Sequence, residues 1–303
     1  MAANNEDRPC SLCGGGKHRL HFALNGNVFR RCRSCGLIKM APLPERLAKG
    51  DDYAGYDLER QRQFTRLFFV PQYWRALRLI QRYKSGGRLL DVGCGTGEFL
   101  DLARQEGFLA FGIEPSERAL FIARRSHPVA WGELNDISLK ENFFDVVTLW
   151  SVLEHVIDPI SFLRKVWLSL KKDGILGLRV PSSRGLLALS ALWLHRLSAG
   201  KIKRPLKVIY QLEWHYKHFY YYDRKNIALL LEKCGFEILE TYDESAYSIS
   251  SLDFRMDYLP RSKALRTMLK AALFFNLHLS RLLRRQDELV IVAKKSGRPL
   301  SSP

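Results

Sequence analysis

The 303-residue chain lacks several features that would place it in a specialised class of protein. No uncharged apolar run approaches the ~20 residues that a membrane-spanning helix needs. The longest such run, from Gly185 to Leu194, has ten residues. The N-terminal residues contain no apolar stretch typical of a secretory signal. Cysteine is scarce, and four of the six cysteines form two Cys-x-x-Cys pairs. These absences predict a protein of the reducing cytoplasm whose paired cysteines bind a metal.

The chain is also poor in acidic residues relative to basic ones. It has 48 lysines and arginines against 31 aspartates and glutamates, a net charge of +17. Residues 1–85 and 181–285 each carry a net charge of +9, whereas residues 86–180 carry −2. With 47% apolar residues, the composition is that of a folded globular protein. We therefore expect a near-neutral core with basic attachments, which suit anionic partners such as nucleic acid or a membrane surface.

The first two zones of the chain precede any regular alternation of strands and helices. Residues 1–50 are rich in loop-forming glycine and proline and contain all four paired cysteines. Residues 51–85 are predicted to form a helical linker, in which Pro71 breaks the helix. After this proline, apolar residues recur at helical spacing with arginines between them.

From residue 86 to 295, short apolar runs alternate with helical segments. This alternation predicts an α/β domain with a parallel, doubly wound sheet. Insertions at 184–222 and 245–286 interrupt the domain, and residues 296–303 are expected to be a disordered tail. The expected strands are 88–92, 109–113, 144–150, 175–180, 236–242 and 288–293, and the expected helices are 98–105, 116–125, 160–170 and 224–234.

The strongest local signal is a glycine-rich turn between an apolar strand and an amphipathic helix, within Leu89–Leu100. Glycines let the backbone turn sharply and approach a ligand closely, and the start of the helix offers unpaired N–H groups. A dinucleotide-binding fingerprint would need its last glycine where Glu98 stands. An ordinary strand-to-helix turn is the alternative interpretation of this segment.

Further motifs follow the turn in a fixed order. The turn reads Asp-Val-Gly-Cys-Gly-Thr-Gly at 91–97, and Gly-Ile-Glu-Pro-Ser follows at 112–116. The later motifs are Gly-Glu-Leu at 132–134, Phe-Asp-Val-Val at 144–147 and Leu-Glu-His-Val at 153–156. Together they resemble the motifs of class I S-adenosylmethionine-dependent methyltransferases, in the ubiquinone-methylase-like branch. The resemblance covers most of 86–242 and implies a Rossmann-like, seven-stranded doubly wound sheet with S-adenosylmethionine as the cofactor.

The resemblance also implies which residues contact the cofactor. Glu114, at the end of the second strand, matches the carboxylate that accepts hydrogen bonds from both ribose hydroxyls, and Glu133–Leu134 matches the stretch that meets adenine. Cys94 occupies a turn position common in the family, and we expect it and Cys234 to be structural. The full set of implied cofactor contacts is Asp91, Gly93, Cys94, Gly95, Thr96, Gly97, Glu114, Pro115, Glu133, Leu134 and Trp150.

Two histidines are candidates for a catalytic base. Methyl transfer needs the donor and the nucleophile held in line, and a hydroxyl acceptor must also lose a proton. His155 lies just past the fourth strand, and His218 lies in an aromatic, basic segment expected to form a lid over the pocket. The alternative for each histidine is a packing role.

The two cysteine pairs predict a structural zinc ribbon over residues 1–50. Cys10 and Cys13 are separated by 18 residues from Cys32 and Cys35, a spacing typical of four-cysteine zinc sites. A glycine follows each pair, where a knuckle turn needs a positive φ. We expect the ribbon and the α/β domain to have separate cores.

The function of the ribbon has two interpretations. Arginines beside the second cysteine pair favour nucleic-acid binding. The segment nevertheless resembles the ribbon of methyltransferases of bacterial polysaccharide and lipopolysaccharide biosynthesis.

Residues 261–285 predict a basic amphipathic helix, with seven lysines or arginines and no acidic residue. Such a helix can lie in an anionic membrane surface, pack on the domain with a solvated basic face, or bind RNA phosphates.

Our first functional hypothesis is a methyltransferase that acts on a small-molecule or glycan acceptor. This hypothesis extends to peripheral membrane binding and to a lipid-linked acceptor. The alternatives are an RNA methyltransferase, with nucleic acid the less favoured partner, and an inactive binding protein of the same fold.

Overall fold

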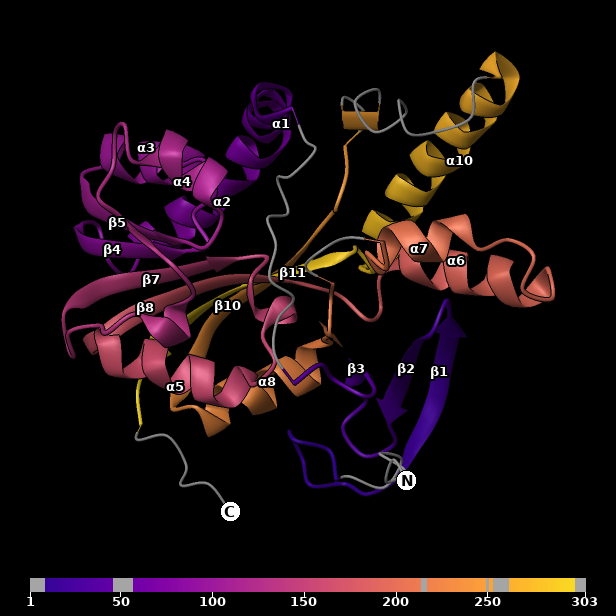
Figure 1. Cartoon of the computed structure of the whole chain (residues 1–303), viewed down its shortest axis with the longest axis horizontal. Coiled ribbons are helices and arrows are strands. Elements are labelled where there is room, and N and C mark those ends of the chain that lie inside the picture. The colour runs from indigo at the N-terminus through magenta and orange to yellow at the C-terminus, as the bar shows by residue number, and fades with distance from the viewer. Residues whose placement is uncertain (1–8, 46–56, 214–216, 249–250, 253–261, 298–303) are drawn as a thin grey trace.

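The structure is a computed structural model that describes residues 9–45, 57–213, 217–248, 251–252 and 262–297 (Figure 1). Its centre is a seven-stranded sheet with the order β10-β11-β8-β7-β4-β5-β6. The five strands from β6 to β8 are parallel, and β11 is antiparallel to both of its neighbours. The strands are β4 (Gly87–Val92), β5 (Phe108–Glu114), β6 (Val129–Trp131), β7 (Phe144–Trp150), β8 (Leu170–Pro181), β10 (Phe236–Glu244) and β11 (Glu288–Lys295).

Helices cover both faces of this sheet, as expected for a doubly wound fold (Figure 1). One face carries α2, α3 and α4, and the other carries α5 and α8. The helices are α2 (Val70–Gln81), α3 (Glu98–Gln105), α4 (Glu117–Ala123), α5 (Pro159–Ser169) and α8 (Arg224–Lys233). The chain runs from β4 outward to β6 and then returns to the other side of β4. This reversal is the topological switch point of the sheet, at the carboxyl ends of β4 and β7, where doubly wound sheets bind ligands.

The predicted fold class is confirmed, with corrections at three elements. Strand β6 was not predicted, because its three residues are too short for a periodic signal. Strand β8 starts at Leu170, five residues before the predicted start, because its first residues pair with β7 at Phe144. Pro71 does not break the helix of the linker. A π-helical turn at Thr65–Phe69 joins α1 (Leu58–Phe64) to α2 without interruption, and Pro71 lies in the first turn of α2, directly after this π-helical turn.

The N-terminal zone forms a small sheet that is completed from the first insertion. Strands β1 (His18–Leu24), β2 (Asn27–Cys32) and β3 (Ile38–Met40) form an antiparallel sheet, and β9 (Tyr220–Tyr221) pairs with β3. The prediction of separate cores is wrong. Phe29 and Ile38 of the ribbon belong to the same buried cluster as Tyr221 and the α5 side of the large sheet.

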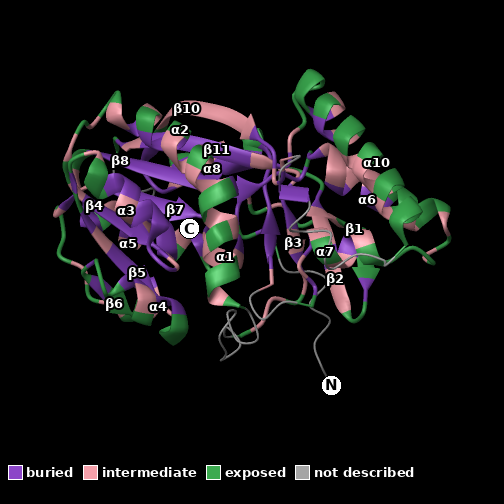
Figure 2. Ribbon diagram, turned by 90° about the horizontal axis from the view of Figure 1, so that it is seen from above, coloured by how far each residue is buried: buried purple, intermediate pink, exposed green. Residues whose placement is uncertain are grey.

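The insertions contribute the remaining helices at one end of the molecule. Helices α6 (Leu186–Leu197) and α7 (Arg204–Ile209) come from the first insertion, and α10 (Lys263–Leu282) confirms the helix predicted in the second. Figure 2 shows that α10 and α6 lie away from the large sheet, on the same side as the ribbon. Among the described helices, none combines the length and apolar character required to cross a bilayer. The end of the expected tail, 298–303, lies outside the described residues.

Candidate active site and cysteine cluster

The glycine loop joins β4 to α3 at the carboxyl ends of the central strands. Gly93, Gly95 and Gly97 all have positive φ, at 73°, 55° and 96°, which side-chain-bearing residues rarely adopt. A Cβ atom on Gly93 would lie 2.8 Å from Cγ2 of Val152. Gly97 is the N-cap residue of α3 and has no side chain to cap it. The first N–H groups of α3 therefore have no side-chain cap.

Glu114 ends β5 with its carboxylate turned toward this loop. One oxygen accepts a hydrogen bond from the Gly95 N–H at 2.7 Å, and the other accepts one from the Ser116 N–H at 2.9 Å. The residue is only 4% exposed. The carboxylate therefore joins the β5 end to the glycine loop, which is the position that the resemblance assigned to it.

Asp91 is the second buried acid of the site, at the end of β4. It accepts a hydrogen bond from the Thr148 hydroxyl of β7 at 2.7 Å. Burial raises the pKa of Asp91 to about 8, and the neighbouring Glu114 carboxylate acts in the same direction. Asp91 is therefore a buried acid held by a hydrogen bond between β4 and β7.

Glu98 is a third buried acid. In the sequence it is evident only as the residue that replaces the last glycine of a dinucleotide-binding fingerprint. Its carboxylate accepts a hydrogen bond from Thr96 Oγ1 at 2.5 Å and pairs with Arg62 Nε at 3.0 Å. Arg62 comes from α1, so this ion pair attaches the linker helix to the start of α3. The sequence shows Glu98 as a charged residue among the apolar residues of α3, which is a signal for a buried acid. It does not show that Arg62, 36 residues earlier, is the partner.

The remaining predicted cofactor contacts differ in their burial and in their hydrogen-bond and packing partners. Leu134 is buried, and partial burial raises the pKa of Glu133. The Pro115 carbonyl accepts a hydrogen bond from the Trp131 indole at 3.0 Å. The Trp150 ring packs against Phe99 and Tyr73 in the core, with centroid distances of 5.2 and 5.8 Å.

Both cysteines expected to be structural are buried. Cys94 lies against β5, where a Cβ atom on Gly112 would approach its Sγ to 2.6 Å. Cys234 follows α8 and is fully buried. Their positions agree with packing roles, although Cys94 also lies in the loop that the resemblance assigns to the cofactor.

Arg179 of β8 is a buried cation beside the site that the sequence analysis missed. Its guanidinium donates to the Ser151 hydroxyl at 3.1 Å and to the Gln72 side chain of α2 at 2.9 Å. It also lies over the Phe69 ring, 4.6 Å from the centroid. Ser151, which follows β7 directly, has a φ of +57°. Arg179 therefore fixes both the strained start of the loop after β7 and the α2 helix that covers it.

The two candidate bases, His155 and His218, lie together with Glu154. The two imidazole rings are 4.8 Å apart, and His218 Nε2 lies 3.9 Å from the Glu154 carboxylate. Burial lowers the pKa of His155 to about 4 and that of His218 well below its usual range. Burial also raises the pKa of Glu154 well above its usual range.

The hydrogen bonds distinguish the two histidines. His155 Nδ1 lies 3.0 Å from the Lys217 carbonyl oxygen, which can only accept, so Nδ1 carries the proton and Nε2 is the basic atom. His218 is 7% exposed, and its Nδ1 is 3.0 Å from the Tyr221 hydroxyl. The segment expected to be a lid is instead packed, because Tyr220, Tyr221 and Tyr222 are fully buried. His215 and Tyr216 fall outside the described residues.

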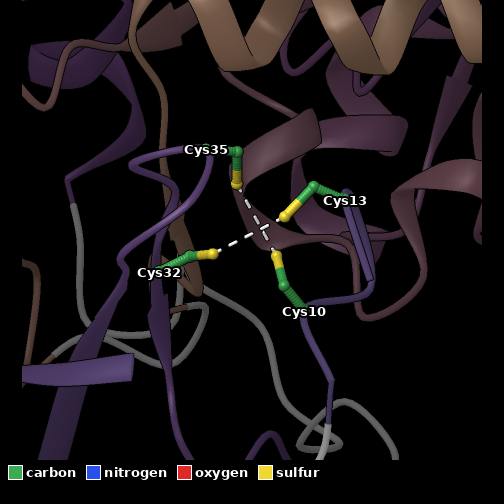
Figure 3. A group of neighbouring side chains, drawn as sticks. All are labelled: Cys10, Cys13, Cys32 and Cys35. Atoms are coloured by element: carbon green, nitrogen blue, oxygen red, sulfur yellow. Dashed lines mark hydrogen bonds between the residues drawn. The ribbon is translucent and has the colours of Figure 1, made fainter. Parts of the chain in front are cut away.

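The four paired cysteines converge at the edge of the ribbon (Figure 3). Cys10 and Cys35 have their Sγ atoms 3.7 Å apart, those of Cys13 and Cys32 are 3.6 Å apart, and all four lie within 4.8 Å of one another. A tetrahedral zinc with Zn–S bonds of about 2.3 Å needs S···S distances of about 3.8 Å. The predicted positive φ after each pair is confirmed, at 72° for Gly14 and 78° for Gly36. The residues therefore fit a zinc ion.

A cavity of about 350 Å³ lies between the ribbon and the segment that follows His155. Its basic lining residues come from the ribbon, apolar residues line it from both sides, and Asp158 is the one acid among the described lining residues. His18 Nε2 is buried and has no hydrogen-bond partner among the described residues. Burial, Lys39 and Arg30 all lower the pKa of His18. The lining residues include His18, Arg30, Lys39, Met40, Leu43, Ile157, Asp158, Ile160 and Tyr220.

Sequence comparisons match the central part of the chain to known methyltransferases. The ubiquinone biosynthesis O-methyltransferase of Haemophilus ducreyi is 35% identical over 104 residues, which are 30% of this chain and 44% of that protein. The mitochondrial enzyme of the same name from Schizosaccharomyces pombe is 34% identical over 133 residues, 41% of this chain and 47% of that protein. These matches thus span less than half the length of either relative.

Solved structures share the fold. Phosphoethanolamine N-methyltransferase 2 of Haemonchus contortus, in complex with S-adenosyl-L-methionine, superposes with a TM-score of 0.53 at 16% identity, covering 86% of this chain and 63% of that one. An S-adenosylmethionine-dependent methyltransferase from Mesorhizobium loti gives 0.50 at 20% identity, covering 73% and 96%. A methyltransferase domain family matches residues 50–241, which include the glycine loop and all the acids around it. The chain belongs to this methyltransferase domain family.

Proposed function

We propose that the protein transfers the methyl group of S-adenosylmethionine to a small-molecule or glycan acceptor. The observation that carries this proposal is the set of buried carboxylates around the glycine loop, from Asp91, Glu98 and Glu114, each less than 8% exposed. S-adenosylmethionine supplies an electrophilic methyl group on a sulfonium, and its positive charges suit this acidic lining. Glu114 is positioned to bind the ribose hydroxyls, and the N–H groups of the loop and α3 bind the polar tail.

We assign the role of proton acceptor to His155 Nε2. The partly similar proteins are named O-methyltransferases, which favours a hydroxyl acceptor that must lose a proton. A pKa of about 4 keeps His155 unprotonated at neutral pH, and its Nδ1–H bond to Lys217 fixes the ring. His218 acts as a positioning residue through its ring contact with His155. Replacing His155 with Gln should lower kcat roughly 10²–10⁴-fold and leave cofactor affinity unchanged.

The cavity beside the ribbon supports an acceptor with an anionic group. Its volume of about 350 Å³ suits a small molecule. His18, Arg30 and Lys39 would bind the anionic group, and the apolar lining would bind the rest of the acceptor. Replacing His18 and Lys39 with Gln should raise KM for the acceptor more than it lowers kcat. An unchanged KM with lowered cofactor affinity would place the acceptor elsewhere.

The zinc ribbon has a structural role in this proposal. Four thiolates leave no open coordination position, so a zinc ion there would support the sheet and take no part in methyl transfer. Elemental analysis should find one zinc per chain. Metal-free protein with the ribbon amides protected from exchange would contradict the assignment.

One experiment separates the candidate functions. Purified protein is incubated with S-adenosylmethionine that carries a tritiated methyl group and with lipid, glycan and RNA fractions of cells. Label in the lipid or glycan fraction supports the proposal, and label in RNA supports the RNA methyltransferase instead. Cofactor binding by calorimetry without label in any fraction would favour a binding protein that has lost catalysis.

A further inference from the structure

The end of the molecule formed by α6, α7 and α10 carries most of its exposed large apolar side chains. In Figure 1, α10 projects from the body beside α6. Among the described residues, 18 large apolar side chains are exposed, and 11 of them lie in 193–208 or 265–283. Soluble monomers rarely expose so much apolar surface in one region without a partner. These 11 are Trp193, Leu194, Leu197, Ile202, Val208, Leu265, Met268, Phe274, Phe275, Leu282 and Leu283.

Helix α10 contacts the body through only a narrow stripe. Leu277 and Ser280 are its buried residues, and the Asn276 side chain donates to Ser190 of α6 at 3.4 Å. At 100° per residue, Leu265, Met268, Phe275 and Leu282 fall within an arc of ~100°, turned ~120° from this stripe. Met268, Phe275 and Leu282 are 69%, 67% and 80% exposed. Part of the apolar face of α10, which was predicted to pack or to enter a membrane, is therefore uncovered, whereas Leu269 and Leu279 of that face are partly buried.

The same end of the molecule is rich in basic residues, and one of them, Lys207 of α7, pairs with Glu213. Residues 174–212 and 258–286 contain no aspartate or glutamate. Exposed Ile202 lies between Lys201 and Lys203, both also exposed, so cations and apolar groups alternate along the connection from α6 to α7. On α10, Lys263 and Arg281 are exposed on a side away from the apolar arc.

We propose that α6, α7 and α10 form a docking surface for an anionic lipid bilayer. Exposed Leu, Met, Phe and Trp side chains enter the interface, while neighbouring lysines and arginines are attracted to the anionic headgroups. RNA would use the cations and leave the apolar side chains in water. A second copy of the chain would bring two predominantly basic ends together, at an electrostatic cost. The inference does not depend on the proposed function, because docking needs neither cofactor nor acceptor.

The test is co-sedimentation of the full chain with lipid vesicles, in the absence of cofactor and acceptor. Vesicles of phosphatidylcholine alone are compared with vesicles of equal parts phosphatidylcholine and phosphatidylglycerol. We expect strong binding to the anionic vesicles only, decreasing steeply with salt as the Debye length shrinks from about 10 Å at 0.1 M to about 3 Å at 1 M. The triple variant Lys201→Gln/Lys203→Gln/Lys263→Gln should weaken binding by up to about fivefold per removed charge.

An apolar variant separates insertion from simple charge attraction. Met268→Ser/Phe275→Ser/Leu282→Ser keeps every cation yet should lose at least tenfold in vesicle affinity. The matched controls Leu109→Ser/Phe121→Ser, at sites 64% and 66% exposed on the far side of the large sheet, and Lys140→Gln/Lys172→Gln/Lys225→Gln should bind as the wild type does. All replaced side chains are exposed, so unfolding temperature and cofactor affinity should not change. Vesicle binding unaffected by the apolar variant, or RNA binding without vesicle binding, would overturn the proposal.

Discussion

At the scale of single residues, the site depends on carboxylates held where water cannot solvate them. Asp91, Glu98 and Glu114 come from three different elements and are all buried near one loop. Burial and the Glu114 charge make an ionised Asp91 unfavourable until a cation joins the two acids, whereas Glu98 is already paired with Arg62. Neighbouring hydrogen bonds from Thr148, Thr96 and the Gly95 N–H hold them in place until then.

Glu114 should contribute directly to cofactor affinity. Glu114→Ala removes a carboxylate that the loop positions for hydrogen bonding, so the binding free energy of S-adenosylmethionine should weaken by about 1.5–3 kcal/mol. Titration calorimetry measures the change, and Glu117→Ala, three residues further along the chain in α4, is the control. Unaltered affinity in Glu114→Ala would remove this residue from the site.

Asp91 should couple cofactor binding to pH. With a pKa of about 8, its carboxyl group is largely protonated at pH 7 in the free protein. A cationic ligand lowers that pKa, so binding releases a proton, and affinity rises as pH increases from 6 toward 8. Calorimetry in two buffers of different ionisation enthalpy gives the proton count. Asp91→Asn should abolish the release that the wild type shows, and equal release in both proteins would contradict the assignment.

At the scale of secondary structure, the sequence predicted elements with strong local patterns and missed those that depend on distant partners. The glycine loop, its flanking strand and helix, and α10 each carry a clear turn or helical period. Strand β9 has two residues and exists because Ile38 and Lys39 of the ribbon pair with it. The π-turn before α2 and the packing of His218 likewise depend on contacts far apart in sequence. The sequence identifies both His155 and His218 as candidate catalytic bases, but it does not show that His218 is buried.

The attachment of α1 should depend on one ion pair. Arg62→Ala leaves the Glu98 carboxylate buried without its cation, so the free energy of unfolding should drop by about 1–3 kcal/mol. The double variant Arg62→Ala/Glu98→Gln removes the stranded charge and should recover most of the loss. Urea unfolding measures both, with the exposed Arg66→Ala as control. Equal losses in the single and double variants would mean that the ion pair does not hold α1.

At the scale of the whole molecule, the ribbon and the α/β domain share one buried hydrophobic cluster. The chain passes between them three times. The ribbon leads through the linker into the large sheet, the first insertion returns to add β9 to the ribbon, and the chain then continues into α8 and β10. Asn226 of α8 donates to the Cys35 carbonyl at 3.4 Å, and the Phe219 N–H donates to the Glu154 carbonyl beside the candidate base at 2.7 Å. The ribbon thus supports the segment that carries His218.

Loss of metal should therefore affect the entire protein. Cys32→Ser, or prolonged treatment with a strong chelator, should remove the proposed zinc ion, whose binding energy would stabilise the ribbon. Because Phe29, Ile38 and Tyr221 share one buried cluster with the α5 side of the large sheet, the ribbon cannot unfold without exposing that face. Calorimetry should show a single transition at a lower temperature, and far-ultraviolet and near-ultraviolet circular dichroism should report the same midpoint. Cys94→Ser, which alters a buried cysteine outside the cluster, controls for loss of a thiol. Two separate transitions, with the α/β domain unfolding at its original temperature, would restore the independent ribbon that the cysteine spacing alone suggested.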